Sequence, residues 1–337
     1  MGYSQRYLTY PAVLIMVAAG WIFSGSSQVK AQDPKVAVDP RTAAPTTESI
    51  GGADRAALNI RVNADLVLIP VMVTDKKDRL ITGLDRSHFR LFEDKVEQPI
   101  THFAAEDVPV SIGLVFDASG SMGPKLGKSR AAVGEFLKTA NPADEFFLIQ
   151  FNDRAQLLRG FTGRGEDIQD KLMFVESKGR TALLDAIYLA LSEMRKAKHS
   201  RKAILILSDG GDNSSRYTLR EVKSRVREAD VQIYSIGILE PLIGRGRTME
   251  EMDGPALLDD IAEESGGRLF EVDNLNILPD VAAKIGTALR NQYVLGFAPS
   301  EPKRDGKYHK IQVKITRPSG VPPLRASFRS GYTAPSN

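Results

Sequence analysis

The sequence predicts an α/β fold: a doubly wound, mostly parallel β-sheet inserted between flanking β-strands that form a small β-sandwich. Two observations predict it. Between residues 108 and 291, short apolar runs alternate with helical patterns, which requires a parallel sheet covered by helices on both faces. On either side, residues 58–105 and 292–333 contain only short strand patterns separated by polar turns, which is typical of a sandwich.

Residues 1–31 have the organisation of a secretory signal peptide. Arg6 precedes an uncharged apolar run, residues 12–23, and the small residues around Ala31 predict cleavage after that position. The run is shorter than the roughly 20 residues that a membrane-spanning helix needs, and an uncleaved signal anchor is the alternative. The chain has no cysteine, so neither a disulfide nor a lipid-bearing cysteine is available. We therefore expect an exported protein without a stable membrane span after cleavage.

The charge balance gives no reason to expect a nucleic acid as a partner. The 45 Lys and Arg residues nearly balance the 42 Asp and Glu residues, leaving a formal net charge of +3. A nucleic-acid surface would require a marked excess of basic residues. Residues 32–57 are rich in Pro, Thr, Ala and Gly, and this composition predicts a flexible linker between the signal peptide and the first strand.

The flanking segments contain strand patterns at both ends of the chain. Alternating apolar residues predict a strand near 66–73, followed by a turn at 75–79. Further strands are expected at 80–84, 88–94 and 99–103, and after the α/β domain at 292–297, 310–316 and 324–330. The N-terminal strands alone would form a thin core. We therefore expect the strands from both ends to pack into one sandwich.

The inserted domain, residues 108–291, alternates strands and helices. Strands are expected at 110–116, 145–151, 202–208, 232–237 and 268–272, with 156–161 as an antiparallel edge. Helices are expected at 125–139, 165–174, 183–197, 218–229, 257–264 and 280–291. The connection 239–254 is longer than usual and leaves the carboxyl end of a strand. It is either a surface insertion or, through Arg245, Arg247 and Met249, part of a partner surface.

Oxygen-bearing side chains follow two of the predicted strands. Asp117, Ser119 and Ser121 alternate after the first strand, so an extended backbone would point all three to one side. Asp209 follows the strand 202–208, and Thr181 precedes the clearest helix. Because the carboxyl ends of neighbouring parallel strands meet at one edge, these side chains should converge. Hard cations such as Mg²⁺ prefer oxygen ligands of this kind.

These motifs resemble the metal-ion-dependent adhesion site of von Willebrand factor type A domains, over roughly Val110 to Asn291. The flanks resemble a bacterial subgroup, the exported von Willebrand factor A-related proteins of acidobacterial type. The resemblance implies hydroxyl ligands from Ser119, Ser121 and Thr181, and charge from Asp117 and Asp209. It further implies that Mg²⁺, with Mn²⁺ or Ca²⁺ as alternatives, bridges to an Asp or Glu carboxylate of a protein partner. The protein would then be a non-enzymatic binding module of the bacterial periplasm or cell surface.

Other functions fit the residues less well. Each motif alone also closes turns or caps helices, so a scaffold that binds its partner without metal remains open. The segment Gly123 to Ser129 resembles a phosphate-binding loop, but three residues separate its glycines where four are needed, and Lys128 falls inside a predicted helix. A hydrolase would need a base beside Ser119 or a second carboxylate beside Asp117, and the four histidines are remote from this motif in sequence.

Overall fold

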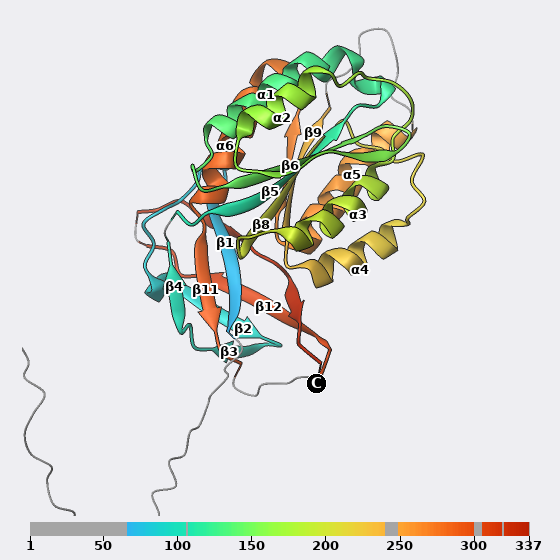
Figure 1. The fold of residues 1–337 in the computed structure, drawn as a ribbon. Helices are drawn as coiled ribbons and strands as arrows, with labels where there is room; N and C mark the ends of the chain where they lie inside the picture. Colours follow the sequence, from blue (N-terminus) through green and yellow to red (C-terminus); the bar gives the residue numbers. More distant parts are fainter. Residues whose placement is uncertain (1–65, 106, 240–248, 300–304, 319, 337) are drawn as a thin grey trace, which may run out of the picture. The chain divides into compact units, whose positions relative to one another are not determined.

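The computed structural model describes residues 66–105, 107–239, 249–299, 305–318 and 320–336 (Figure 1). The chain divides into two compact units, Met1–Ile60 and Arg61–Asn337, and every described residue belongs to the second. The predicted signal peptide and linker, as well as Arg245 and Arg247, lie outside the described residues. Within the described ranges, no helix combines the length and apolar character needed to cross a bilayer.

A six-stranded sheet forms the centre of the α/β domain, in the order β10-β9-β8-β5-β6-β7. Its strands are β5 (Val110–Asp117), β6 (Glu145–Phe151), β7 (Ala155–Thr162), β8 (Arg201–Ser208), β9 (Gln232–Ile238) and β10 (Arg268–Val272). All neighbouring strands run parallel except β7, which pairs antiparallel with β6 at the edge. The predicted doubly wound sheet and its antiparallel edge strand are confirmed.

Six α-helices cover the two faces of this sheet (Figure 1). They are α1 (Leu126–Lys138), α2 (Gly165–Met173), α3 (Leu183–Glu193), α4 (Leu219–Ala229), α5 (Met249–Ser265) and α6 (Leu278–Arg290). Side chains alternate along a strand, so Leu114 and Phe116 of β5 pack with α1, α2 and α6, whereas Val115 packs on the face of α3, α4 and α5. Because both faces are covered, β5 is buried along its whole length.

Two four-stranded antiparallel sheets make up the flanking sandwich, in the orders β13-β1-β11-β4 and β14-β12-β2-β3. The strands are β1 (Val67–Asp75), β2 (Phe89–Glu93), β3 (Val96–Gln98), β4 (His102–Ala104), β11 (Tyr293–Phe297), β12 (Tyr308–Ile315), β13 (Leu324–Ser327) and β14 (Gly331–Thr333). β1 lies between the C-terminal strands β11 and β13, and β2 pairs with β12. The α/β domain is thus inserted between strands that complete each other's sheets.

The structure differs from the sequence prediction in several segments. The short strands β3 and β14 were not predicted, and the strand expected at 99–103 begins only at His102. Residues 80–84 are not a strand: Leu80 forms only an isolated bridge with Thr74, and Gly83 has a φ of 80°, which interrupts an extended run. The predicted loop 239–254 is wrong at its end, because α5 already begins at Met249. Gly254 lies inside the helix against Gly210, where a Cβ would come within 2.4 Å of the Gly210 Cα.

Candidate metal centre

The two predicted aspartates meet at the carboxyl edge of the sheet. Phe116 of β5 pairs in register with Leu207 of β8, so the next residues, Asp117 and Ser208, lie side by side. Asp117 Oδ2 accepts a hydrogen bond from Ser208 Oγ at 2.5 Å, and its Oδ1 accepts one from the Ser119 backbone N–H at 2.8 Å. Asp209 follows Ser208 directly, and both aspartates are buried.

The serine hydroxyls lie together, although not for the reason that the sequence predicts. Ser119 is extended, with φ −65° and ψ 166°, but a 3-10 helix begins at Gly120 and continues to Lys125. The expected alternation on extended backbone therefore ends at Ser119. The tight turn nevertheless places Ser119 Oγ 3.1 Å from Ser121 Oγ. A hydrogen bond of 3.0 Å from the Gly120 N–H to the Gly179 carbonyl holds the turn against the next loop.

The loop that carries Thr181 is hydrogen-bonded to both strand-end loops. The Lys178 N–H donates to the Ala118 carbonyl at 2.9 Å. On the other side, the Thr181 N–H donates to Asn213 Oδ1 at 2.9 Å, and the Asn213 N–H donates to the Thr181 carbonyl at 3.0 Å. The N-cap of α3 is Ala182, so the buried Thr181 hydroxyl does not serve as the cap of that helix. The backbone thus brings the three loops together into one structure.

A lysine that the sequence analysis missed also enters the site. Lys125 Nζ donates to Asp209 Oδ2 at 2.7 Å, and the two side chains are only 6% and 2% exposed. The other Asp209 oxygen, Oδ1, is buried and has no hydrogen-bond partner among the described residues. In the sequence, this lysine lies in the segment 123–129 that resembles a phosphate-binding loop and directly follows the turn-forming pair Gly123-Pro124. Neither signal indicates where its side chain points.

The electrostatics of the site favour a bound cation. Burial, and next the charge of Asp209, raise the pKa of Asp117 to about 7, although hydrogen bonds from Ser119 and Ser208 act in the opposite direction. The Asp117 carboxyl is therefore costly to ionise without added positive charge, whereas the buried Asp209 is already paired with Lys125. Across the described residues, no group of three or more His, Cys, Asp and Glu side chains forms a metal cage. Two carboxylates with neutral hydroxyls and an unpartnered buried oxygen fit a hard divalent cation.

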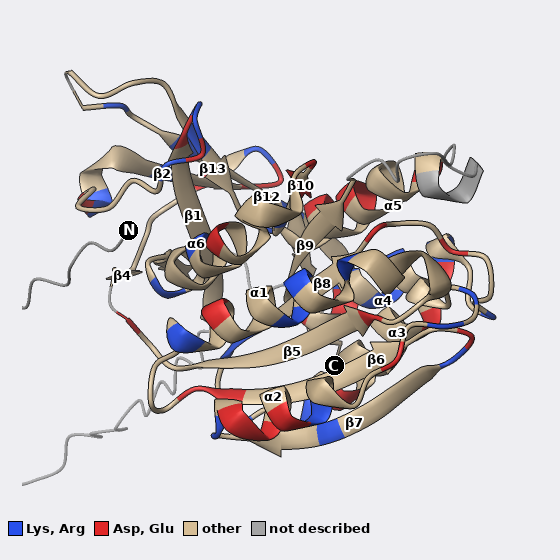
Figure 2. Ribbon diagram, turned by 90° about the horizontal axis from the view of Figure 1, so that it is seen from above, with Lys and Arg blue, Asp and Glu red and all other residues tan. Residues whose placement is uncertain are grey.

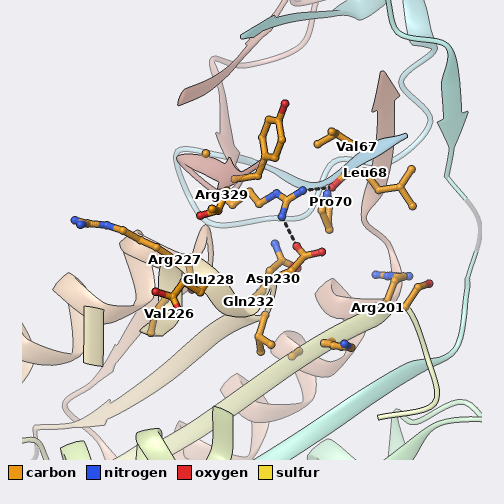
Figure 3. Close-up of a pocket in the computed structure, with 18 of the residues that line it drawn as sticks. Val67, Leu68, Pro70, Arg201, Val226, Arg227, Glu228, Asp230, Gln232 and Arg329 are labelled. Carbon is orange, nitrogen blue, oxygen red and sulfur yellow. Dashed lines mark hydrogen bonds and ion pairs between the residues drawn. The ribbon is translucent and has the colours of Figure 1, made fainter. Parts of the chain in front are cut away.

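A pocket lies at the opposite end of β8 from the candidate metal centre. This pocket has a volume of about 460 Å³ and is lined by Arg201, the first residue of β8, together with residues of β1, α4 and the C-terminal strands (Figure 3). Arg329 donates to the Leu68 carbonyl at 2.8 Å and forms an ion pair with Asp230. None of the five predicted metal ligands lines this pocket. It separates the sandwich from the α/β domain and is distinct from the candidate metal centre.

Comparisons with known proteins find a curated relative and solved structures that are similar to part of this chain. Mouse inter alpha-trypsin inhibitor, heavy chain 4, is 28% identical over 153 residues, which are 41% of this chain but only 16% of that protein. The solved structure of a von Willebrand factor type A protein from Catenulispora acidiphila covers 78% of this chain and 74% of its own, with 12% identity and a TM-score of 0.47. The solved structure of the conserved hypothetical protein BatB from Bacteroides thetaiotaomicron covers 53% of this chain and 98% of its own, with 20% identity and a TM-score of 0.42.

The family model of the von Willebrand factor type A domain matches residues 111–284, which run from β5 into α6. This match spans just over half of the chain and includes all five predicted ligands. The chain therefore belongs to the von Willebrand factor type A domain family.

Proposed function

We propose that this chain is an exported interaction module that binds a protein partner through a divalent cation. Domains of this family commonly mediate protein–protein interaction or adhesion. The cation, Mg²⁺ in the first place, would be held by Asp117, Ser119, Ser121, Thr181 and Asp209. The observation that carries the proposal is the buried, unpartnered Asp209 Oδ1 at the same strand edge as Asp117, the carboxyl whose pKa is raised.

The residues divide into neutral and charged ligands. The hydroxyls of Ser119, Ser121 and Thr181 would contribute oxygen without charge, and the two aspartates would contribute one negative charge each. When bound, the cation would supply electrostatic attraction for a carboxylate, because hard divalent ions accept further oxygen ligands. An Asp or Glu side chain of the partner fits this chemistry. Basic and acidic residues are interspersed over the helices and loops in Figure 2, which gives no support to a nucleic-acid partner.

The contacts around the site support binding rather than catalysis. Lys128 and Ser129 lie within α1, and the Ser129 hydroxyl donates to the Lys125 carbonyl of the preceding turn instead of facing a phosphate site. The ring of His199 contacts the Ala143 carbonyl, and His309 contacts Asp94 within the sandwich. These positions do not provide Ser119 with a general base.

A metal-independent scaffold is the second candidate function. The observation in its favour is the ion pair between Lys125 and Asp209, which already balances one carboxylate with a side chain of the protein. In that case the α/β domain would bind its partner through its surface alone.

Isothermal titration of MgCl₂ distinguishes the two candidates. We expect one binding event with the wild-type chain and none with Asp117→Ala. Lys128→Ala is the matched control, because this exposed lysine lies in α1, three residues after Lys125, and does not pair with either aspartate. Absence of binding heat in all three proteins would favour the scaffold. A pull-down from a bacterial envelope extract, with and without chelator, then tests whether partner capture depends on the metal.

A further inference from the structure

We infer that Lys125 is a built-in counter-ion that competes with the divalent cation for Asp209. It would stabilise the metal-free site and weaken metal binding. The inference rests on the proposed metal site, but it concerns a residue outside the five predicted ligands, and it makes a prediction of its own about metal affinity.

The position of Lys125 is determined by the fold. It ends the 3-10 helix that carries Ser121, immediately before α1, and its carbonyl accepts the Ser129 hydroxyl at 3.0 Å. Its side chain is 6% exposed, although lysine side chains normally extend into solvent. The 2.7 Å contact to Asp209 therefore belongs to the packed interior of the site and is not a surface ion pair.

The ammonium group occupies the electrostatic position that the site offers to a cation. Of the two Asp209 oxygens, Oδ2 is bonded to Lys125 and Oδ1 is unpartnered. A divalent ion near Oδ1 must either displace the ammonium from Oδ2 or tolerate a like charge a few ångströms away. Both outcomes reduce the net affinity for the metal. Removal of Lys125 should destabilise the metal-free site and raise its affinity for the metal, because Asp209 is then a buried carboxylate with no positive partner until a metal binds.

Lys128 provides a matched comparison. It has the same charge and lies three residues further on, at an exposed position of α1. Replacement of either lysine by methionine removes one positive charge from the same region of the chain. Only Lys125→Met removes the partner of Asp209, so a difference between the two variants reports the contact rather than the net charge.

The experiment combines MgCl₂ titration with thermal unfolding in chelator and in saturating Mg²⁺. We expect Lys125→Met to bind Mg²⁺ roughly tenfold more tightly or better than wild type. We expect it to unfold at a lower temperature than wild type in chelator, and to regain that loss with Mg²⁺. Lys128→Met should match wild type in both measurements. A lysine with a purely structural role would lower stability without raising metal affinity.

Two outcomes would overturn the inference. If Lys125→Met binds Mg²⁺ no more tightly than Lys128→Met, the competition is refuted while the proposed function stands. If neither wild type nor any variant binds Mg²⁺, both the competition by Lys125 and the proposed metal-dependent function are refuted. If Lys125→Met does not fold in chelator, the double variant Lys125→Met/Asp209→Asn serves as a second test, because it also removes the carboxylate that Lys125 had neutralised. It should then unfold near the wild-type temperature, and a double variant as unstable as Lys125→Met would refute the counter-ion role.

Discussion

The replacement Asp117→Asn should stabilise the metal-free protein at alkaline pH, although it removes a proposed ligand. The pKa of the buried carboxyl is raised from 3.8 to about 7, first by burial and then by the charge of Asp209. Since the pKa in the folded state exceeds that of the unfolded chain, this group's contribution to stability is complete below about pH 4. The contribution falls as the pH rises and is lost above about pH 7.

The magnitude follows from the shift in pKa. A shift of about three units corresponds to roughly 4 kcal/mol of unfavourable free energy when the carboxyl ionises in the folded state. Asparagine stays neutral and keeps an acceptor for the Ser119 N–H, but it disturbs the bond from Ser208, at a cost of about 1 kcal/mol. We therefore expect a gain of about 3 kcal/mol at pH 8, and a difference near zero or slightly unfavourable at pH 4.5.

Urea unfolding in chelator at the two pH values measures this difference directly. The comparison of variant with wild type reports on the pair formed by Asp117 and Asp209, because the charge of Asp209 is one cause of the raised pKa, while the remaining titrating groups are shared. In saturating Mg²⁺ at pH 8 the advantage of the variant should shrink or reverse, since only the wild type gains binding energy from the metal. A variant that is less stable than wild type at pH 8 in chelator, or a difference independent of pH, would refute the reasoning.

Two further predictions concern other parts of the fold. Gly254→Ala should lower the free energy of unfolding by about 2 kcal/mol, because the added Cβ would overlap the backbone of the facing loop. Urea unfolding measures this loss, with Gly127→Ala as the control because a Cβ at Gly127 would meet open space. Burial alone would lower the pKa of His309, but hydrogen bonds with Asp94 and a second aspartate raise it overall. The stability that this histidine adds should thus be complete below about pH 6.5 and decline as the pH rises. His309→Gln should remove this decline in unfolding experiments at pH 6 and pH 8; an unchanged decline would contradict it.

The strands and most helices were predictable because their burial leaves a periodic signal. β5 is mostly apolar because both faces of the sheet are covered, and Thr218 caps α4 through a capping box with Glu221 that the sequence displays. The start of α5 was not predictable, because the helix includes Gly254 and Pro255, two residue types that usually interrupt a helix.

The candidate site also contains residues that could be predicted from the sequence and one that could not. Asp117 and Asp209 could be placed together from the strand pattern alone, because parallel strand ends converge. Lys125 could not, since its partner is 84 positions away and the contact depends on the path of a 3-10 turn. Sequence periodicity contains information about strands and helices, but not about the direction of one side chain at the end of a short turn.

A crystal structure of the protein with Mn²⁺, with the metal located by its anomalous scattering, tests the central claim most directly. We expect one peak enclosed by Asp117, Ser119, Ser121, Thr181 and Asp209, with at least two side-chain oxygens within about 2.5 Å of it. An ordered site at saturating Mn²⁺ without such a peak, with the five side chains in clear density, would contradict it.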